Sequence, residues 1–258
     1  MFTRICATTL LTGALVTPPA YHANIRLADF LTGSTEALVL GPTGIPTPDS
    51  GYLAAADNLY LDPLGFDGTT IALTTPETHD FGPSVTQGET DLINTVTSMY
   101  NAGDFSATDP LTIMGYSQSS TIESMAEQTL ANDGIPSDAL RFVMLGDPSS
   151  AEGGVLNTWG DTTIGKETLD LLGWGNLIND TTPNDLYPTD VYTLNGDHFA
   201  DYPAMASNAL LIHLDYLGLT EAQIQSATST VDGLTDYFTI PDPSNLLDAL
   251  LNAFIAVG

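Results

Sequence analysis

The hexapeptide Gly115-Tyr116-Ser117-Gln118-Ser119-Ser120 constrains the fold of this chain more than any other segment. It follows the apolar run 111–114, which predicts a strand, and precedes residues 121–130, which predict a helix. A strand and a helix joined by a sharp turn with a central serine form a nucleophile elbow. Gly115 lets the backbone turn at low steric cost, so the Ser117 hydroxyl is lifted above the sheet edge, where a base can reach it. We therefore predict that Ser117 is a nucleophile, with a chance turn as the alternative.

Two backbone amides are candidates for an oxyanion hole beside this serine. The Gln118 amide lies at the start of the predicted helix, where it can face a developing negative charge. A second amide is expected from the loop after an early strand, and the Gly/Pro-rich loop 41–44 follows the apolar run 37–40. Thr43 is the candidate in that loop, with a plain turn as the alternative.

Apolar runs that alternate with amphipathic segments predict the fold class. The predicted strands are 37–40, 70–73, 111–114, 140–145 and 191–194, the last clear one, and the predicted helices are 51–61, 83–100, 121–130 and 204–216. Strands alternating with helices favour a mostly parallel sheet flanked by helices on both faces. Together with the elbow, this order predicts an α/β-hydrolase fold.

A serine nucleophile needs a base, and the chain has four histidines. In this fold the order along the chain is Ser, then Asp or Glu, then His. His22 lies in an N-terminal segment that has the pattern of an export signal, and His79 precedes the serine. His198 and His213 remain as candidates. We favour His213, because its distance from the preceding strand gives the chain room to return to the serine.

The acid is expected just after a late strand, and Asp197 follows the run 191–194. His198 is adjacent to Asp197, so in an extended segment their side chains point apart, which disfavours that pair. Asp201 is the second candidate for the acid, although capping of the following helix would also explain it. Asp147, which follows another strand, is the third. The predicted triad is Ser117, Asp197 and His213.

Two further segments predict parts of a substrate pocket. Residues 146–190 form a long connection that contains Trp159 and Trp174 and predicts a lid or a pocket wall, with a surface loop as the alternative. Residues 244–257 carry an apolar helical stripe, which predicts a helix docked on the core or a flap over an apolar pocket. The stripe consists of Leu246, Leu247, Leu250, Leu251, Phe254 and Ile255.

Composition excludes several classes of function. With 32 acidic and 4 basic side chains the formal net charge is −28, so no basic patch can form. Nucleic-acid binding is therefore excluded, and attraction to anionic lipid headgroups is unfavourable. The sequence has no metal-ligand constellation and no phosphate-binding glycine loop, so we predict no metal and no cofactor.

The N-terminal residues predict export. Arg4, the apolar stretch 5–16 and the segment 17–23 have the pattern of a signal peptide, with an uncleaved anchor as the alternative. Cys6, the only cysteine, lies in this segment, so a mature chain would contain no disulfide. We predict residues 1–23 as signal peptide or anchor, residues 24–258 as a single hydrolase domain, and a secreted or cell-envelope location.

Several motifs occur in a fixed order along most of the chain. They are GPTGIPTP (41–48), TPE (75–77), SVTQG (84–88), GYSQSSTI (115–122), LGDP (145–148) with GG (153–154), YPTDVY (187–192), ADYP (200–203) and NAL (208–210). Taken in this order, they resemble the PE-PPE domain family of mycobacteria and relatives. The resemblance implies a cutinase-like serine α/β-hydrolase with Ser117 as nucleophile, Asp197 as acid and His213 as base. The family tolerates Ser at the position of Ser119, but usually has Tyr-Asp-Gly before Ala-Asp, where this chain has Gly196-Asp197-His198.

The resemblance also implies a class of substrate, because family members are esterases of medium acyl esters and some are acyltransferases that build cell-envelope glycolipids. We therefore expect a secreted hydrolase of small-molecule or lipid acyl esters, or an acyltransferase, that works through an acyl-enzyme and contacts a lipid interface transiently. The alternative is a non-catalytic cell-surface or lipid-binding protein that keeps the hydrolase fold.

Overall fold

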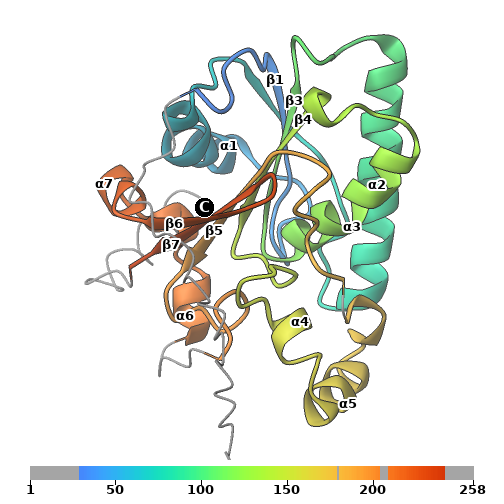
Figure 1. The fold of residues 1–258 in the computed structure, drawn as a ribbon, viewed down its shortest axis with the longest axis vertical. Helices are drawn as coiled ribbons and strands as arrows, with labels where there is room; N and C mark the ends of the chain where they lie inside the picture. Colours follow the sequence, from blue (N-terminus) through green and yellow to red (C-terminus); the bar gives the residue numbers. More distant parts are fainter. Residues whose placement is uncertain (1–28, 179, 204–208, 242–258) are drawn as a thin grey trace, which may run out of the picture.

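A computed structural model describes residues 29–178, 180–203 and 209–241 of the chain. Its centre is a seven-stranded sheet in the order β2-β1-β3-β4-β5-β7-β6 (Figure 1). Neighbouring strands are parallel throughout, except that β6 is antiparallel to β7. The strands are β1 (Glu36–Val39), β2 (Thr69–Ala72), β3 (Leu111–Tyr116), β4 (Leu140–Leu145), β5 (Thr189–Leu194), β6 (Thr228–Asp232) and β7 (Thr235–Ile240).

Helices cover both faces of this sheet, with α2 and α3 on one face and α1 and α7 on the other (Figure 1). The helices are α1 (Ser50–Ala56), α2 (Phe81–Ala102), α3 (Gln118–Asn132), α4 (Val155–Thr158), α5 (Thr163–Leu171), α6 (Ala209–His213) and α7 (Glu221–Gln225). A turn of π-helix, Asp57–Leu61, continues α1. The architecture confirms the predicted α/β class with a mostly parallel sheet flanked by helices.

Side chains of the central strands alternate between two apolar layers, as the two-residue period of a strand requires. Leu38 of β1 and Ile113 of β3 pack in the layer that contains α2 and α3. Their neighbours Val39 and Met114 pack in the layer that contains α1. Both faces of the sheet are thus buried, which is why these strands read as continuous apolar runs in the sequence.

One strand prediction was wrong, because the run 191–194 is not the last strand. β6 and β7 follow it and form the end of the sheet. Both are rich in threonine and lack a long apolar run, which is the signal that identified the other strands. The two-residue loop between them begins with Gly233, whose φ is +62°. Asp232 and Gly233 form an Asp-Gly pair, which is a sequence signal for a tight hairpin turn.

Only residues 209–216 of the predicted helix at 204–216 can be compared with the structure, and the helix ends there before residue 214. α6 covers residues 209–213, residues 204–208 lie outside the described part, and a 3₁₀ turn follows at Tyr216–Gly218. The export signal and the apolar stripe at 244–257 also lie outside the described residues. Within the part that is described, no helix combines the length and apolar character needed to cross a membrane.

Candidate active site

The elbow at Ser117 joins the end of β3 to the start of α3. Ser117 has φ +60° and ψ −115°, a backbone conformation that non-glycine residues rarely adopt. A Cβ on Gly115 would lie 2.5 Å from the Glu123 carboxylate and 2.8 Å from the Ser119 backbone carbon, so only glycine fits there. The Ser117 amide donates to the Leu145 carbonyl at 2.8 Å, which ties the turn to the end of β4.

The serine at the last elbow position has its own role in this turn. The Ser119 hydroxyl accepts a hydrogen bond from the Tyr116 amide at 2.8 Å and donates to the Tyr116 carbonyl at 3.1 Å. These bonds satisfy two backbone groups at the point where the strand ends. The departure from a glycine at this position is therefore accommodated by the turn itself.

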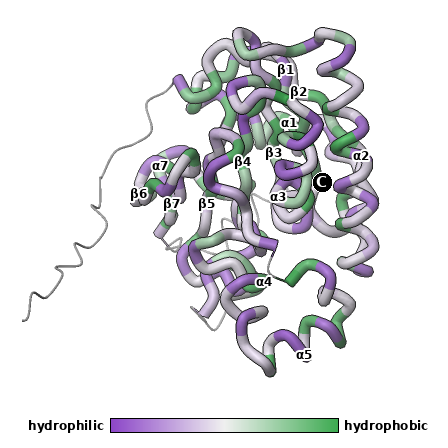
Figure 2. The backbone as a smooth tube through the Cα atoms, turned by 45° about the vertical axis from the view of Figure 1, so that its right-hand side comes forward, coloured by the Kyte–Doolittle hydropathy of each residue, from purple (hydrophilic) through white to green (hydrophobic). Residues whose placement is uncertain are grey.

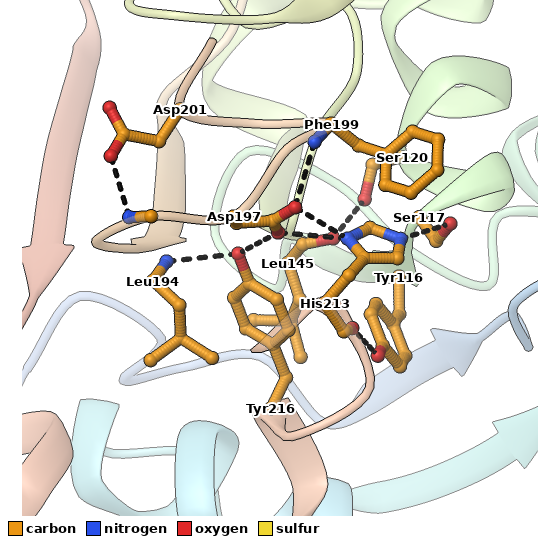
Figure 3. Close-up of polar contacts among 11 residues, drawn as sticks. Tyr116, Ser117, Ser120, Leu145, Leu194, Asp197, Phe199, Asp201, His213 and Tyr216 are labelled. Carbon is orange, nitrogen blue, oxygen red and sulfur yellow. Dashed lines mark hydrogen bonds and ion pairs between the residues drawn. The ribbon is translucent and has the colours of Figure 1, made fainter. Parts of the chain in front are cut away.

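The three residues predicted as a triad lie in one hydrogen-bonded chain (Figure 3). His213 Nε2 lies 2.8 Å from the Ser117 hydroxyl oxygen. His213 Nδ1 lies 2.8 Å and 3.0 Å from the two carboxylate oxygens of Asp197. With a proton on Nδ1, the imidazole donates to Asp197 and presents Nε2 as an acceptor to the serine hydroxyl.

Asp197 follows β5, and its side chain is fully buried. Its carboxylate accepts hydrogen bonds from the Tyr216 hydroxyl at 2.7 Å and the Phe199 amide at 2.9 Å, besides that from His213. Burial alone would raise the pKa of Asp197, but His213 and these donors together hold the pKa below its ordinary value. The carboxylate is thus ionised at neutral pH and orients the imidazole.

His213 is the last residue of α6, and its neighbours fix the position of its ring. The Tyr116 hydroxyl donates to the His213 backbone carbonyl, and the ring of Phe199 packs against the imidazole with centroids 4.5 Å apart. A Cβ on Gly146 would lie 3.2 Å from His213 Cε1 and 2.9 Å from the Tyr216 ring. Gly146, at the end of β4, therefore leaves the room that the histidine needs.

The other acid and base candidates lie apart from this chain of contacts. The Asp201 carboxylate accepts from the Gly196 amide at 2.7 Å and points away from the histidine (Figure 3). Asp147 accepts from the Ser149 amide and from the Thr182 hydroxyl. Neither carboxylate orients a histidine.

The remaining histidines differ from one another. The His198 ring lies between aromatic side chains, with its centroid 5.7 Å from that of Tyr202 and 6.0 Å from that of Phe199. His79 lines the same cavity as Ser117, although its place in the sequence made it an unlikely base. Residue His22 lies outside the described residues.

The two predicted oxyanion-hole residues are joined through a side chain. The Gln118 amide nitrogen Nε2 donates to the Thr43 hydroxyl oxygen at 2.7 Å and to the Thr78 carbonyl at 3.0 Å. Since the Thr43 oxygen accepts this bond, its own O–H is left to donate elsewhere. Thr43 and Ser117 both line one cavity.

A cavity of about 470 Å³ opens above Ser117. Its walls are mostly apolar, and the polar side chains among them are Thr43, His79, Ser117 and His213. Trp174 lines this cavity as predicted, but Trp159 does not, because its ring stacks on Tyr202 at 6.0 Å. The apolar part of the wall consists of Pro42, Ile45, Tyr52, Phe81, Tyr116, Pro148, Trp174, Phe199, Leu210, Leu214 and Leu217.

This arrangement can carry out nucleophilic chemistry on an apolar substrate. A serine, a histidine and a buried carboxylate are connected at hydrogen-bond distances, beside a cavity of the size that small-molecule ligands occupy. Among the described residues, no group of three or more His, Cys, Asp or Glu side chains is placed to hold a metal ion.

Sequence reasoning missed several residues that support the site. Tyr216 bridges the Asp197 carboxylate and the Leu194 amide, and Tyr116 anchors the backbone of His213. Both contacts join segments that are distant in sequence or follow an irregular turn, so no periodic pattern marks them. Gly146 was visible as part of the Leu-Gly-Asp-Pro motif, which the structure explains by the close approach of His213.

Comparison with known proteins identifies the family. The family model described as "PE-PPE domain" matches residues 45–250, which is most of the chain. The chain belongs to the PE-PPE domain family. The match spans the elbow, the strand before Asp197 and the helix that ends at His213.

Two relatives of this PE-PPE domain come from Mycobacterium tuberculosis. One is an uncharacterized PPE family protein, PPE28, which is 31% identical over 83% of this chain and 34% of its own length. The other is named Esterase PE16 and is 29% identical over 93% of this chain and 53% of its own length. The chain thus spans between a third and about half of these curated relatives.

A solved structure supports the same fold. A cutinase-like protein from Cryptococcus sp. superposes with a TM-score of 0.50 over 76% of this chain and 92% of its own, at 18% sequence identity. The fold of this PE-PPE domain is therefore that of a cutinase-like α/β-hydrolase.

Proposed function

We propose that this protein is a serine esterase that transfers the acyl group of apolar esters through an acyl-enzyme. The observation that carries the proposal is the unbroken chain from the Ser117 hydroxyl through His213 to the buried Asp197 carboxylate, at the floor of an apolar cavity. Membership of a family that includes a protein named Esterase PE16 supports it.

In the acylation step, His213 Nε2 takes the proton of the Ser117 hydroxyl while the serine oxygen attacks the carbonyl carbon of the ester. Asp197 holds the imidazole and stabilises the imidazolium that forms. As the tetrahedral intermediate collapses, the imidazolium gives its proton to the leaving alkoxide. The products of this step are a free alcohol and an acyl group bound to Ser117.

Charge that develops on the carbonyl oxygen needs hydrogen-bond donors that are already in place. We assign the backbone amides of Gln118 and Thr43 to this role. The Thr43 hydroxyl is a third donor in this proposal, because its oxygen accepts from the Gln118 side chain and its proton is left to donate. Gln118 thus acts twice, as a donor through its backbone and as a positioning residue through its side chain.

In the deacylation step, His213 activates either water or an acceptor alcohol, which releases an acid or a new ester. A largely apolar cavity suits the acyl chain of a small-molecule or lipid ester. Transfer to an alcohol acceptor, as in the assembly of cell-envelope lipids, is the second outcome that the same residues support. The N-terminal pattern favours export, so we propose that the enzyme works in the cell envelope or outside the cell.

The test is activity combined with labelling of the serine. Purified protein should hydrolyse p-nitrophenyl butyrate and react with a fluorophosphonate probe, and Ser117→Ala should abolish both, with a loss of kcat on the order of 10⁶. His213→Ala should remove activity as well, whereas His198→Ala should leave most of it. Retention of more than a few per cent of activity in Ser117→Ala would overturn the assignment.

Product analysis distinguishes the two fates of the acyl group. With a p-nitrophenyl ester as donor, free fatty acid indicates hydrolysis, and a new ester formed when a glycolipid alcohol is added indicates transfer. A folded protein that neither reacts with the fluorophosphonate probe nor releases p-nitrophenol from the ester would point instead to a lipid-binding protein that keeps the fold.

A further inference from the structure

Six large aliphatic side chains are exposed to solvent on two short helices and the residues next to them. Leu171 is 87% exposed, Ile164 75% and Leu210 61%, values that are high for side chains of this size. Together these six residues are called the apolar rim. They are Ile164, Leu171 and Leu172 on or next to α5, and Leu210, Leu211 and Leu214 on or next to α6.

The apolar rim meets the cavity above Ser117 at two places. Leu210 and Leu214 are exposed and also line the cavity, so the apolar wall continues outward into the rim at these residues. At the other place, Leu172 comes two residues before Trp174, which lines the cavity. The ring of Phe199 lies 6.4 Å from Trp174 and 4.5 Å from His213 between ring centroids.

Both helices are at the same end of the molecule, the lower end in Figure 1, and Figure 2 shows α5 there with hydrophobic residues next to hydrophilic ones. Leu210 and Leu214 are exposed and line the cavity, so this part of the rim lies at the cavity mouth. Isolated exposed leucines need no explanation, but six exposed aliphatic side chains on two helices, two of which line an apolar cavity, mark an interaction surface.

The charge of the protein limits the kind of partner. The chain carries 32 acidic and 4 basic residues, so an anionic surface would repel it. The basic residue of α5, Lys166, lies 3.5 Å from Asp170 on the same helix, so its charge is paired with a carboxylate. Nothing on either helix thus attracts an anionic headgroup, whereas the exposed aliphatic side chains gain by leaving water in any apolar layer.

We infer that the apolar rim docks the enzyme on the surface of a neutral or zwitterionic lipid layer, with the mouth of the cavity facing the lipid. This inference rests on the proposed function, because it describes how an ester in that layer reaches Ser117 without crossing water. The acyl chain would pass from the layer along Leu210 and Leu214 into the cavity.

The test uses rim residues that do not line the cavity, and a matched pair of exposed residues elsewhere. The rim variant carries Ile164→Ser, Leu171→Ser, Leu172→Ser and Leu211→Ser. The control carries Val231→Ser and Leu234→Ser. Val231 is 65% exposed and Leu234 40%. Both lie at the β6–β7 turn next to the first residue of β5, whereas Ser117 follows the last residue of β3, so the two sites are at opposite ends of the strands.

Binding is measured by co-flotation with phosphatidylcholine vesicles, in the Ser117→Ala background so that turnover does not change the vesicles. We expect the parent to float with the vesicles, the rim variant to lose at least tenfold in partition coefficient, and the control to stay within twofold. Replacing a third of the lipid by phosphatidylglycerol should weaken binding. A parent that does not float, or a rim variant that floats equally well, would overturn the inference.

Three further measurements separate the explanations. Hydrolysis of dissolved p-nitrophenyl butyrate by the rim variant with Ser117 intact should equal that of the parent. If neither protein hydrolyses this ester, the proposed function fails, and docking is then judged by flotation alone. The melting temperature should not change, since exposed side chains stabilise the fold little. A fall of several degrees, or a dimer in sedimentation that the rim variant abolishes, would show that protein covers the rim and would overturn the inference.

Discussion

At the scale of single residues, Asp197 is the group whose surroundings are most completely determined. Its two oxygens accept from the His213 ring, the Tyr216 hydroxyl and the Phe199 amide, and no part of it is exposed to water. These donors fit a carboxylate, which only accepts hydrogen bonds, and they do not fit an amide, which must also donate.

Asp197→Asn should therefore lower kcat by about 10⁴, because the imidazole is then held in the wrong tautomer. The measurement is kcat with p-nitrophenyl butyrate. Asp201→Asn is the control, since Asp201 accepts from the Gly196 amide and has no hydrogen bond to a histidine among the described residues, and we expect a change of a few-fold at most. If Asp201→Asn is the more damaging change, the acid must be reassigned.

Thr43 offers a second residue-scale prediction, because the roles proposed for its hydroxyl and for its backbone amide can be tested separately. Thr43→Val keeps the shape and the amide but removes the hydroxyl, and should lower kcat by roughly 10²-fold with little change in KM, as expected for a lost oxyanion donor. Thr43→Ser keeps the hydroxyl and should recover most of the activity. Equal loss in both variants would assign the effect to packing of the loop.

The candidate site could be predicted from the sequence to the extent that its residues follow strands. Ser117 and Asp197 each come just after a strand end, and the order along the chain then selects His213 over His79. The hydrogen bond from the Gln118 side chain to Thr43 could not be predicted, because it joins residues 75 positions apart through a side-chain rotamer. The same holds for Tyr116, which bonds His213 across 97 positions.

At the scale of elements, the elbow depends on a close approach of β3 and α3. Gly115 has no room for a Cβ, because the Ser119 backbone and the Glu123 carboxyl both lie within 3 Å of the place where it would be. The carboxyl can rotate away, but the backbone of α3 cannot move without shifting Ser117.

Gly115→Ala should thus destabilise the protein by about 1–3 kcal/mol and displace the serine, so that kcat falls together with the melting temperature. Adding Glu123→Ala to it removes one of the two obstacles, and should restore part of the stability but little of the activity, since the contact with Ser119 remains. An unchanged melting temperature in Gly115→Ala would show that the elbow is looser than its geometry indicates.

Elements were predictable where a single apolar run was long enough to be buried on both faces. β3 and β4 are of this kind, since every residue of β3 and all but one residue of β4 are buried. β6 lies at the edge of the sheet, three of its five residues are exposed, and its one apolar residue is Val231. Its pairing with β7 is fixed by the Gly233 turn, a local signal that composition alone does not show.

At the scale of the whole molecule, acidic side chains dominate, and several of them lie inside the protein. Glu123 and Glu127 on α3 are buried and have no hydrogen-bond partner in the described part of the chain, and burial raises the pKa of each well above its ordinary value. Burial also raises the pKa of Asp147 to about 6, of Asp180 to about 7 and of Glu77 to about 8. The folded protein therefore keeps protons that the unfolded chain releases near pH 4.

This difference sets the sign of the pH dependence of stability. Between about pH 4 and the raised pKa values, the native state binds more protons than the unfolded chain, so the free energy of unfolding falls as the pH rises. Asp197 has a lowered pKa and works in the opposite direction, but its contribution is lost only as the pH falls below the unfolded value near 4. Stability should therefore be greatest at mildly acidic pH.

We expect the melting temperature to be highest near pH 5 and to fall steadily toward pH 8.5. Each buried carboxyl that ionises in this range contributes a slope of up to about 1.4 kcal/mol per pH unit. Repulsion among surface carboxylates would also disfavour the folded state, but these groups are already ionised by about pH 6, and salt screens them. The fall in melting temperature should consequently persist in 0.5 M NaCl, where the screening length is roughly 4 Å and interactions between surface charges are weak.

Matched variants identify the groups responsible. Glu77→Gln and Asp180→Asn together remove the two carboxyls whose pKa values lie near 8 and 7, and should flatten the fall between pH 6 and 8.5. Glu167→Gln, which removes an exposed carboxylate on α5, should leave the slope unchanged. A melting temperature that rises with pH across this window, or a slope that salt abolishes, would show that buried carboxyls do not control the stability of the molecule.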